Sequence, residues 1–294
     1  NKYNLLIANG ISPSKASTMI FNVPEVTNPN MLIIIGSIIF VIFTLAIGTS
    51  NIEFSQEIVF IGSFAIILTL LFKLSNELDL KAKRMLLGTA IIIFAFRAMP
   101  GVGQGGSWFE IDVLGFDQEF LSLLGLIASF LTIIGIFVLR PLMEKSSMTK
   151  LIVILSIAGS FFILPSIAMF YGFHEFTSKI TNGLVDARFI AIFNTALESP
   201  LGQVSMIPIL AWIAQSAPNH LKATFFAVLA SFTNLALSAS NLGTKYLNQI
   251  YVITREVKTN LGDIKIPADY SELGILMIIV CLLTLVVPIG VTFI

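Results

Sequence analysis

Five long segments of this sequence lack any Asp, Glu, Lys or Arg, and they restrict the fold more than any other feature. They are residues 31–48, 121–139, 151–173, 223–244 and 273–294. The hydrocarbon core of a bilayer is roughly 30 Å thick, so an α-helix that rises about 1.5 Å per residue crosses it in about 20 residues. The segments are that long or close to it, and they do not alternate between apolar and polar residues as the strands of a membrane β-barrel do. They predict transmembrane α-helices.

Composition and charge support the same class. Hydrophobic residues make up 56% of the chain and charged residues only 12%, whereas about a quarter of the residues of a soluble domain are charged. The net charge is zero, so nothing indicates a nucleic-acid partner. The single cysteine, Cys281, excludes an internal disulfide and a multi-cysteine metal site, and His174 and His220 lack metal-ligand spacing. We expect an all-α, polytopic integral membrane protein with no cofactor or metal.

The pattern predicts eight spans: residues 31–48, 57–73, 85–100, 119–140, 151–172, 186–214, 222–248 and 273–294. The leading segment and the connections after the second, fourth and sixth spans carry the basic residues Lys2, Lys15, Lys73, Lys81, Lys83, Arg84, Arg140, Lys145, Lys150 and Lys222. The alternate loops at 49–56 and 101–118 contain acidic residues and no basic ones. Basic loops stay on the cytoplasmic side, so we expect both termini to be cytoplasmic in a plasma or inner membrane. The mixed-charge loop at 249–272 is an exception to this pattern.

The charged stretch 74–84 divides the predicted spans into two and six. Six-span halves joined by a basic cytoplasmic linker are the plan of major-facilitator transporters. On this plan residues 1–73 hold the last two helices of an N-terminal half, 74–84 form the linker, and 85–294 form a C-terminal six-helix half. The chain begins with Asn1 rather than Met and has no signal-peptide pattern. We therefore expect a major-facilitator-like bundle that is incomplete at its N-terminus.

Polar residues follow one stripe of the seventh predicted span: Thr224, Ser231, Asn234, Ser238, Asn241, Lys245 and Asn248. Their spacings of three, four and seven place them on one face of a helix. Small polar residues also occur where membrane helices pack together, and Ser231 and Ser238 alone would fit that role. The asparagines and the lysine of this stripe favour the wall of a hydrated cavity instead.

The sixth predicted span contains an acidic residue near mid-membrane. Asn194 and Glu198 lie four residues apart on one helical face, just before Pro200, which lacks a backbone donor. Glu198 could carry a coupling proton or hold a donor group of a substrate, or it could be a protonated structural residue bonded to a neighbouring helix. Asp186 and Arg188 at the outer end could form a gating pair or extend toward the interface.

The third predicted span ends in an arginine and a glycine-rich turn. Arg97 would suit a carboxylate, either Glu198 or an anionic substrate, although an arginine extending to the interface is an equal alternative. Residues 101–106 (GVGQGG) match the nucleotide pattern G-x-G-x-x-G, but the βαβ unit that gives this pattern its meaning is absent. We interpret the glycines as a broken or flexible end of the span.

These motifs make the chain resemble a known family. Residues 186–244 resemble the folate–biopterin transporter family of the major facilitator superfamily, and residues 96–116 are similar to that family's seventh helix and following loop. The resemblance is carried by the acidic residue ahead of the tenth helix, Met206, Pro208, Ala223, Thr224, Phe226, Ala227, Ser231 and Asn234. The chain departs from the family with Ala217-Pro218 in place of Cys-Pro, and with Lys222 in place of Glu.

The resemblance implies secondary active transport, as a symporter working by alternating access, of a small organic solute such as a folate or pterin. Asn194, Glu198, Asn234 and Asn241 could then hold the pterin edge, with Ser238 beside them. Arg97 could hold a glutamyl tail. The alternatives are a major-facilitator carrier of a peptide, a sugar or a lipid-linked solute, or a membrane protein that does not transport. Membrane enzymes usually cluster His, Asp or Glu at the interface and this sequence does not, so we do not expect an enzyme.

Overall fold

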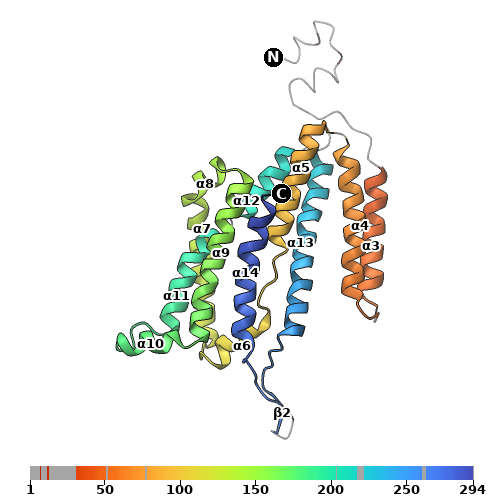
Figure 1. The fold of residues 1–294 in the computed structure, drawn as a ribbon. Coiled ribbons are helices and arrows are strands. Elements are labelled where there is room, and N and C mark those ends of the chain that lie inside the picture. Colours follow the sequence, from red (N-terminus) through yellow and green to blue (C-terminus); the bar gives the residue numbers. More distant parts are fainter. Residues whose placement is uncertain are drawn as a thin grey trace.

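The computed structural model describes Ile7, Ser12 and residues 31–50, 52–76, 78–202, 204–216, 222–259 and 263–293. Within these residues the chain forms a bundle of long α-helices with one short hairpin of strands at one end (Figure 1). Lys2, Lys15 and the Ala217-Pro218 pair lie outside the described residues.

The helices follow the predicted spans closely. They are α3 Met31–Gly48, α4 Ser55–Ser75, α5 Leu80–Arg97, α6 Gln104–Asp112, α7 Gln118–Val138, α8 Arg140–Lys145, α9 Met148–Phe170, α10 Phe173–Ile180, α11 Ala187–Glu198, the 3₁₀ helix η1 Ser199–Leu201, α12 Met206–Ser216, α13 Lys222–Ile250 and α14 Leu273–Val291. Strands β1 Val257–Lys258 and β2 Ile264–Ile266 pair antiparallel. Seven of the eight predicted spans each correspond to one helix whose ends agree within five residues. The span predicted over 186–214 is instead divided into α11, η1 and α12, because Pro200 removes a helical hydrogen bond.

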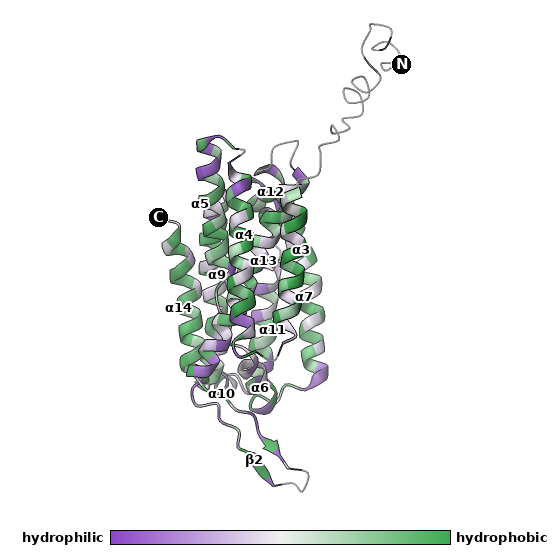
Figure 2. Ribbon diagram, turned by 90° about the vertical axis from the view of Figure 1, so that its right-hand side faces the viewer, coloured by the Kyte–Doolittle hydropathy of each residue, from purple (hydrophilic) through white to green (hydrophobic). Residues whose placement is uncertain are grey.

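Five described helices are long and apolar enough to cross a membrane: α4, α7, α9, α13 and α14. Figure 2 shows hydrophobic residues along the middle of the helices, with most hydrophilic residues toward their two ends. This distribution confirms the predicted all-α, polytopic membrane bundle. The connection between α4 and α5 covers only residues 76–79, so the basic residues Lys81, Lys83 and Arg84 of the predicted linker lie on α5 itself.

Four helices begin at a polar side chain that accepts a hydrogen bond from the backbone N–H three residues later. These N-caps are Asp79 on α5, Asp117 on α7, Ser147 on α9 and Asp186 on α11. Such side chains satisfy amide groups that have no helical partner. They explain why these helices begin close to the predicted positions.

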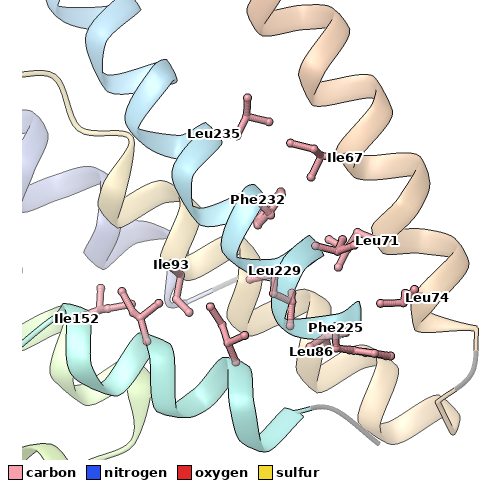
Figure 3. Packing of buried hydrophobic residues seen from close by; sticks show 14 residues of the cluster. Ile67, Leu71, Leu74, Leu86, Ile93, Ile152, Phe225, Leu229, Phe232 and Leu235 are labelled. Carbon is pink, nitrogen blue, oxygen red and sulfur yellow. The ribbon is translucent and has the colours of Figure 1, made fainter. Parts of the chain in front are cut away.

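The largest buried cluster lies where α13 meets α4, α5, α9 and α12 (Figure 3). Leu71, Ile93, Phe225 and Leu229 are each at most 1% exposed there. Lipid tails are as apolar as these side chains, so the cluster stabilises the bundle through close packing rather than through removal of surface from water. Helices α3 and α4 lie on one side of α13, and α7, α9 and α11 lie on the other (Figure 1). Helix α13 therefore lies between the two groups.

Candidate functional site

A cavity of about 510 Å³ lies between α3, α4 and α13. Organic ligands usually occupy pockets of about 300–1,000 Å³ that are mainly apolar and contain a few polar groups. Asn234, Ser238 and Asn241, three of the predicted substrate-binding residues, line this cavity from α13 together with Ser231. The helical spacing correctly indicated that these side chains share a surface. It is the packing of α4 beside α13 that makes the surface one wall of a cavity.

The opposite walls combine aromatic and small polar side chains. Phe40 and Thr44 line the cavity from α3, and Gln56, Phe60 and Ser63 line it from α4. The Thr44 hydroxyl is buried and has no hydrogen-bond partner in the described part of the chain. A buried hydroxyl without a partner is unfavourable, and Thr44 places one in the wall of the cavity. The cavity thus presents flat apolar surfaces beside several polar groups.

An ion pair links α4 to α13 next to the cavity. Lys245 Nζ lies 2.7 Å from Glu57 Oε1, and the Tyr246 hydroxyl donates to the same oxygen at 2.8 Å. Glu57 Oε2 is buried and has no partner among the described residues. The side chain of Glu57 is only 13% exposed. Charges in such a position are tolerated only when they are paired.

Sequence reasoning missed Glu57 because it lies at the boundary of the second predicted span, where a carboxylate resembles an ordinary interfacial residue. The predicted topology nevertheless indicated that Glu57 and Lys245 lie at the same end of the bundle. In the predicted topology the second span begins, and the seventh ends, on the same side of the membrane, which brings Glu57 and Lys245 to one end of the bundle. No other acidic residue occurs between Glu57 and Asn76.

A second polar face of α13 holds the turn between α5 and α6. The Ser240 hydroxyl donates to the Met99 carbonyl oxygen at 2.6 Å, and the Thr244 hydroxyl accepts from the Gly101 N–H at 2.8 Å. Asn248 Nδ2 donates to the Val102 carbonyl oxygen at 3.1 Å. Asn248, which the sequence placed on the same stripe as Asn234, therefore anchors the chain rather than lining the cavity.

The contact between α13 and the turn after α5 also accounts for the glycine-rich motif at residues 101–106. Gly103 has a φ of +79°, a left-handed conformation that favours glycine. A Cβ atom at Gly103 would lie 2.8 Å from Asn248 Nδ2. The motif thus serves a sharp turn against α13, in agreement with its interpretation as a broken end of the span.

Arg97 lies in the last turn of α5, outside the cavity lining. Its Nη1 donates to the Met206 sulfur at 3.3 Å, and its Nε is buried without a partner in the described part of the chain. No described carboxylate lies within salt-bridge distance of Arg97. The structure therefore does not bring Arg97 and Glu198 together.

Asn194 and Glu198 lie on α11, which packs against α7 and α9 rather than against α13. Asn194 Nδ2 donates to the Phe162 carbonyl oxygen at 3.2 Å, and the residue lines an apolar groove beside α9. Glu198 is exposed. Neither residue lines the cavity between α3, α4 and α13, so the structure divides the six predicted substrate-binding residues among three places.

Asp186 and Arg188 have separate partners. Asp186 caps α11 by accepting from the Phe189 N–H at 2.8 Å. Arg188 Nη2 lies 2.7 Å from Asp117 Oδ2, and its guanidinium lies over the Phe120 ring, 5.1 Å from the ring centre. Arg188 thus connects the start of α11 to the start of α7, and the predicted pairing of Arg188 with Asp186 does not occur in this conformation.

A third ionic cluster ties the loop between α13 and α14 to the end of α6. Arg255 donates to both carboxylate oxygens of Asp112, at 2.8 and 2.7 Å, and the Tyr270 hydroxyl donates to Oδ2 at 2.7 Å. The hydrogen bonds from Arg255 and Tyr270 lower the pKa of Asp112 below its usual range. Burial, followed by the bond to Asp112, raises the pKa of Tyr270 to about 12. Among the described residues no three His, Cys, Asp or Glu side chains could share a metal ion.

Comparison with known proteins adds family information to this geometry. The model of the BT1 family matches residues 31–294. A folate-biopterin transporter of Synechocystis sp. is 23% identical to the chain over 156 residues, which cover 53% of this chain and 30% of the relative. The match thus spans less than a third of that relative's length. No solved structure matches the chain.

Proposed function

The chain belongs to the BT1 family, and on this premise we propose that it acts in secondary active transport of a folate- or pterin-like solute, which binds in the cavity between α3, α4 and α13. The family match agrees with the resemblance of residues 186–244 to folate–biopterin transporters. A relative described as a folate-biopterin transporter supports this solute class.

The polar face of α13 beside aromatic side chains is the observation that carries this proposal. A pterin is a flat fused ring whose edge alternates hydrogen-bond donors and acceptors. The amides of Asn234 and Asn241 offer both kinds of group. Phe40 and Phe60 supply flat apolar surface for the ring faces.

The position of the cavity suits alternating access. In the proposed domain plan α3 and α4 belong to an N-terminal half and α13 belongs to the C-terminal half. Transporters of the major-facilitator plan bind their solute near mid-membrane between two such halves and rock them in turn. A cavity between α4 and α13 would then open toward one side or the other as the halves move.

A carrier of another organic solute in the same superfamily is the second candidate. The cavity's amide and hydroxyl groups would also suit a sugar or a peptide. Competition separates the two candidates: excess unlabelled sugar or dipeptide should leave folate and biopterin uptake unchanged, whereas each pterin compound should compete with the other.

Uptake of labelled folate and biopterin by the full-length protein in proteoliposomes tests the proposal. Replacing Asn234 or Asn241 by Leu removes hydrogen bonds to the solute, and we expect each change to raise the half-saturating concentration by roughly tenfold. Gln249→Leu is the matched control, because Gln249 is an exposed amide on the same helix outside the cavity. Equal uptake by the Asn234→Leu, Asn241→Leu and control variants would exclude this cavity as the binding site.

A further inference from the structure

We propose that Glu57 and Lys245 form a proton-controlled anion site at the edge of the cavity: when Glu57 takes up a proton, the Lys245 ammonium is released to bind a carboxylate group of the solute. This inference rests on the proposed function. It assigns a specific function to an ion pair that lies beside the main cavity but does not line it.

Lys245 continues the polar surface of the cavity. It lies four residues after Asn241 and seven after Ser238, so the three side chains share one face of α13. An open hollow of about 490 Å³ is lined by Phe54, Ser55, Gln56, Glu57 and Lys245, and Gln56 also lines the main cavity. The side chain of Lys245 is 35% exposed. A solute in the cavity could therefore place a charged tail beside this ammonium.

Glu57 binds the Lys245 ammonium in the present conformation. Its Oε1 accepts from both Lys245 and Tyr246, while Oε2 is buried without a partner in the described part of the chain. A proton on Oε2 would therefore disturb no hydrogen bond that Glu57 now accepts. It would remove the negative charge that holds Lys245.

Few other charges of the described residues face this pair. Helix α4 packs against α3 and α13. The sequence of α3 contains no ionisable side chain, and Lys245 and Tyr246 are the titratable groups that α13 presents to Glu57. Glu53, in the loop before α4, is exposed. The charge state of Glu57 therefore determines whether Lys245 is neutralised within the protein.

Proton binding and anion binding become coupled as a result. The Glu57 carboxylate and a solute carboxylate compete for one ammonium, and a protonated Glu57 no longer competes. The proton passes from water to a carboxylate oxygen, Lys245 stays protonated, and no covalent bond of the solute changes. Binding of the anion thus favours uptake of one proton, and the proton favours the anion equally, as linkage requires.

Folate and biopterin distinguish this site from the rest of the cavity, since folate carries carboxylates on its glutamyl tail and biopterin carries none. Their affinities for the full-length protein would be measured with labelled compounds between pH 5.5 and pH 7.5. We expect folate, but not biopterin, to bind more tightly as the pH falls. We expect Glu57→Gln to bind folate tightly at every pH in this range. Glu53→Gln, which changes an exposed carboxylate nearby, should behave as the unmodified protein.

The lysine is tested with a pair of variants. At pH 5.5, where Lys245 is free to bind the solute, Lys245→Met should weaken folate binding by about tenfold or more and leave biopterin within about twofold. Because this change leaves Glu57 buried without its cation, the variant could fail to fold. The double variant Glu57→Gln, Lys245→Met removes both charges, and we expect it to fold and to show the same selective loss of folate binding.

The outcomes distinguish an anion site from a purely structural ion pair. Retained pH dependence in Glu57→Gln, or unchanged folate affinity of the double variant at pH 5.5, would overturn the anion site, while biopterin binding would still support the proposed function. An equal loss of folate and biopterin binding in the double variant would assign the pair a structural role. Failure of the unmodified protein to bind either compound would overturn the proposed function and this inference with it.

Discussion

Gly135 on α7 lies directly against Pro200, and a Cβ atom at position 135 would overlap the backbone of Pro200. One turn earlier on the same helix, the Thr132 hydroxyl donates to the Ser199 carbonyl oxygen at 2.9 Å. Pro200 has no N–H and cannot continue the hydrogen bonds of α11. Helix α7 therefore supports the break between α11 and α12 with one close approach and one hydrogen bond. This support makes the interrupted span a feature of the packed bundle.

Gly135→Ala should destabilise the protein, because neither the Pro200 backbone nor α7 can move away without disturbing its neighbours. Overpacking of this kind costs about 1–3 kcal/mol. Thermal unfolding in detergent measures the effect. Gly125→Ala on the same helix is the control, since a Cβ atom there meets nothing within 4 Å. Equal midpoints for the two variants would show that the contact is not tight.

Thr132→Val should have a smaller effect. The substitution keeps the shape of the side chain and removes the hydrogen bond to Ser199, and such bonds in membrane bundles contribute about 0.6 kcal/mol on average. Thr132→Ser retains the hydroxyl and should keep most of the stability. If both variants unfold at the same temperature, the hydrogen bond does not support the break.

The Asp112 cluster predicts a dependence of stability on low pH. Hydrogen bonds from Arg255 and Tyr270 lower the pKa of Asp112 in the folded protein. The stabilisation from this carboxylate is therefore present above its unfolded pKa of about 3.9 and is lost as the pH falls through its lower folded value. Asp112→Asn should be less stable at pH 7 and should lose less stability on acidification. Unfolding midpoints between pH 7 and pH 2.5 check this, and parallel curves would contradict it.

Tyr270 predicts the opposite trend at high pH. Its pKa is raised to about 12, so its contribution to stability is fully present below the unfolded value of about 10 and is lost as the pH rises through about 12. Tyr270→Phe should remove this contribution and flatten the alkaline limb of the stability curve. Ultraviolet titration of phenolate absorbance in the two proteins would show whether one tyrosine is missing from the groups that ionise near pH 12.

If the proposed transport is driven by protons, two carboxylates are candidates for the coupling proton, and parallel variants separate them. The sequence alone favoured Glu198, which predicts that Glu198→Gln abolishes proton-driven uptake. In the structure Glu198 is exposed and outside the cavity lining, whereas Glu57 is paired beside the cavity. We expect proton-driven folate uptake to lose its pH dependence in Glu57→Gln and to keep it in Glu198→Gln. The reverse result would restore Glu198 to the coupling role.

The membrane spans could be predicted from the sequence because their determinants are local. A helix of α9's length needs only a charge-free apolar segment and a cap such as Ser147 at its start. Helical periodicity likewise identified the shared face of Asn234, Ser238 and Asn241 before any neighbour was known. Each of these features depends on residues close together in the chain.

The tertiary structure alone decided which helices those faces meet. Glu57 and Lys245 are separated by 188 positions and meet only because α4 packs beside α13. Conversely, Arg97 and Glu198, plausible partners by charge, lie on helices that hold them against other neighbours. Apolar side chains fit lipid and protein almost equally well, so hydropathy places a helix in the membrane without selecting its neighbours. Close packing and individual polar contacts make that selection, and they join residues whose separation in the chain conceals the pairing.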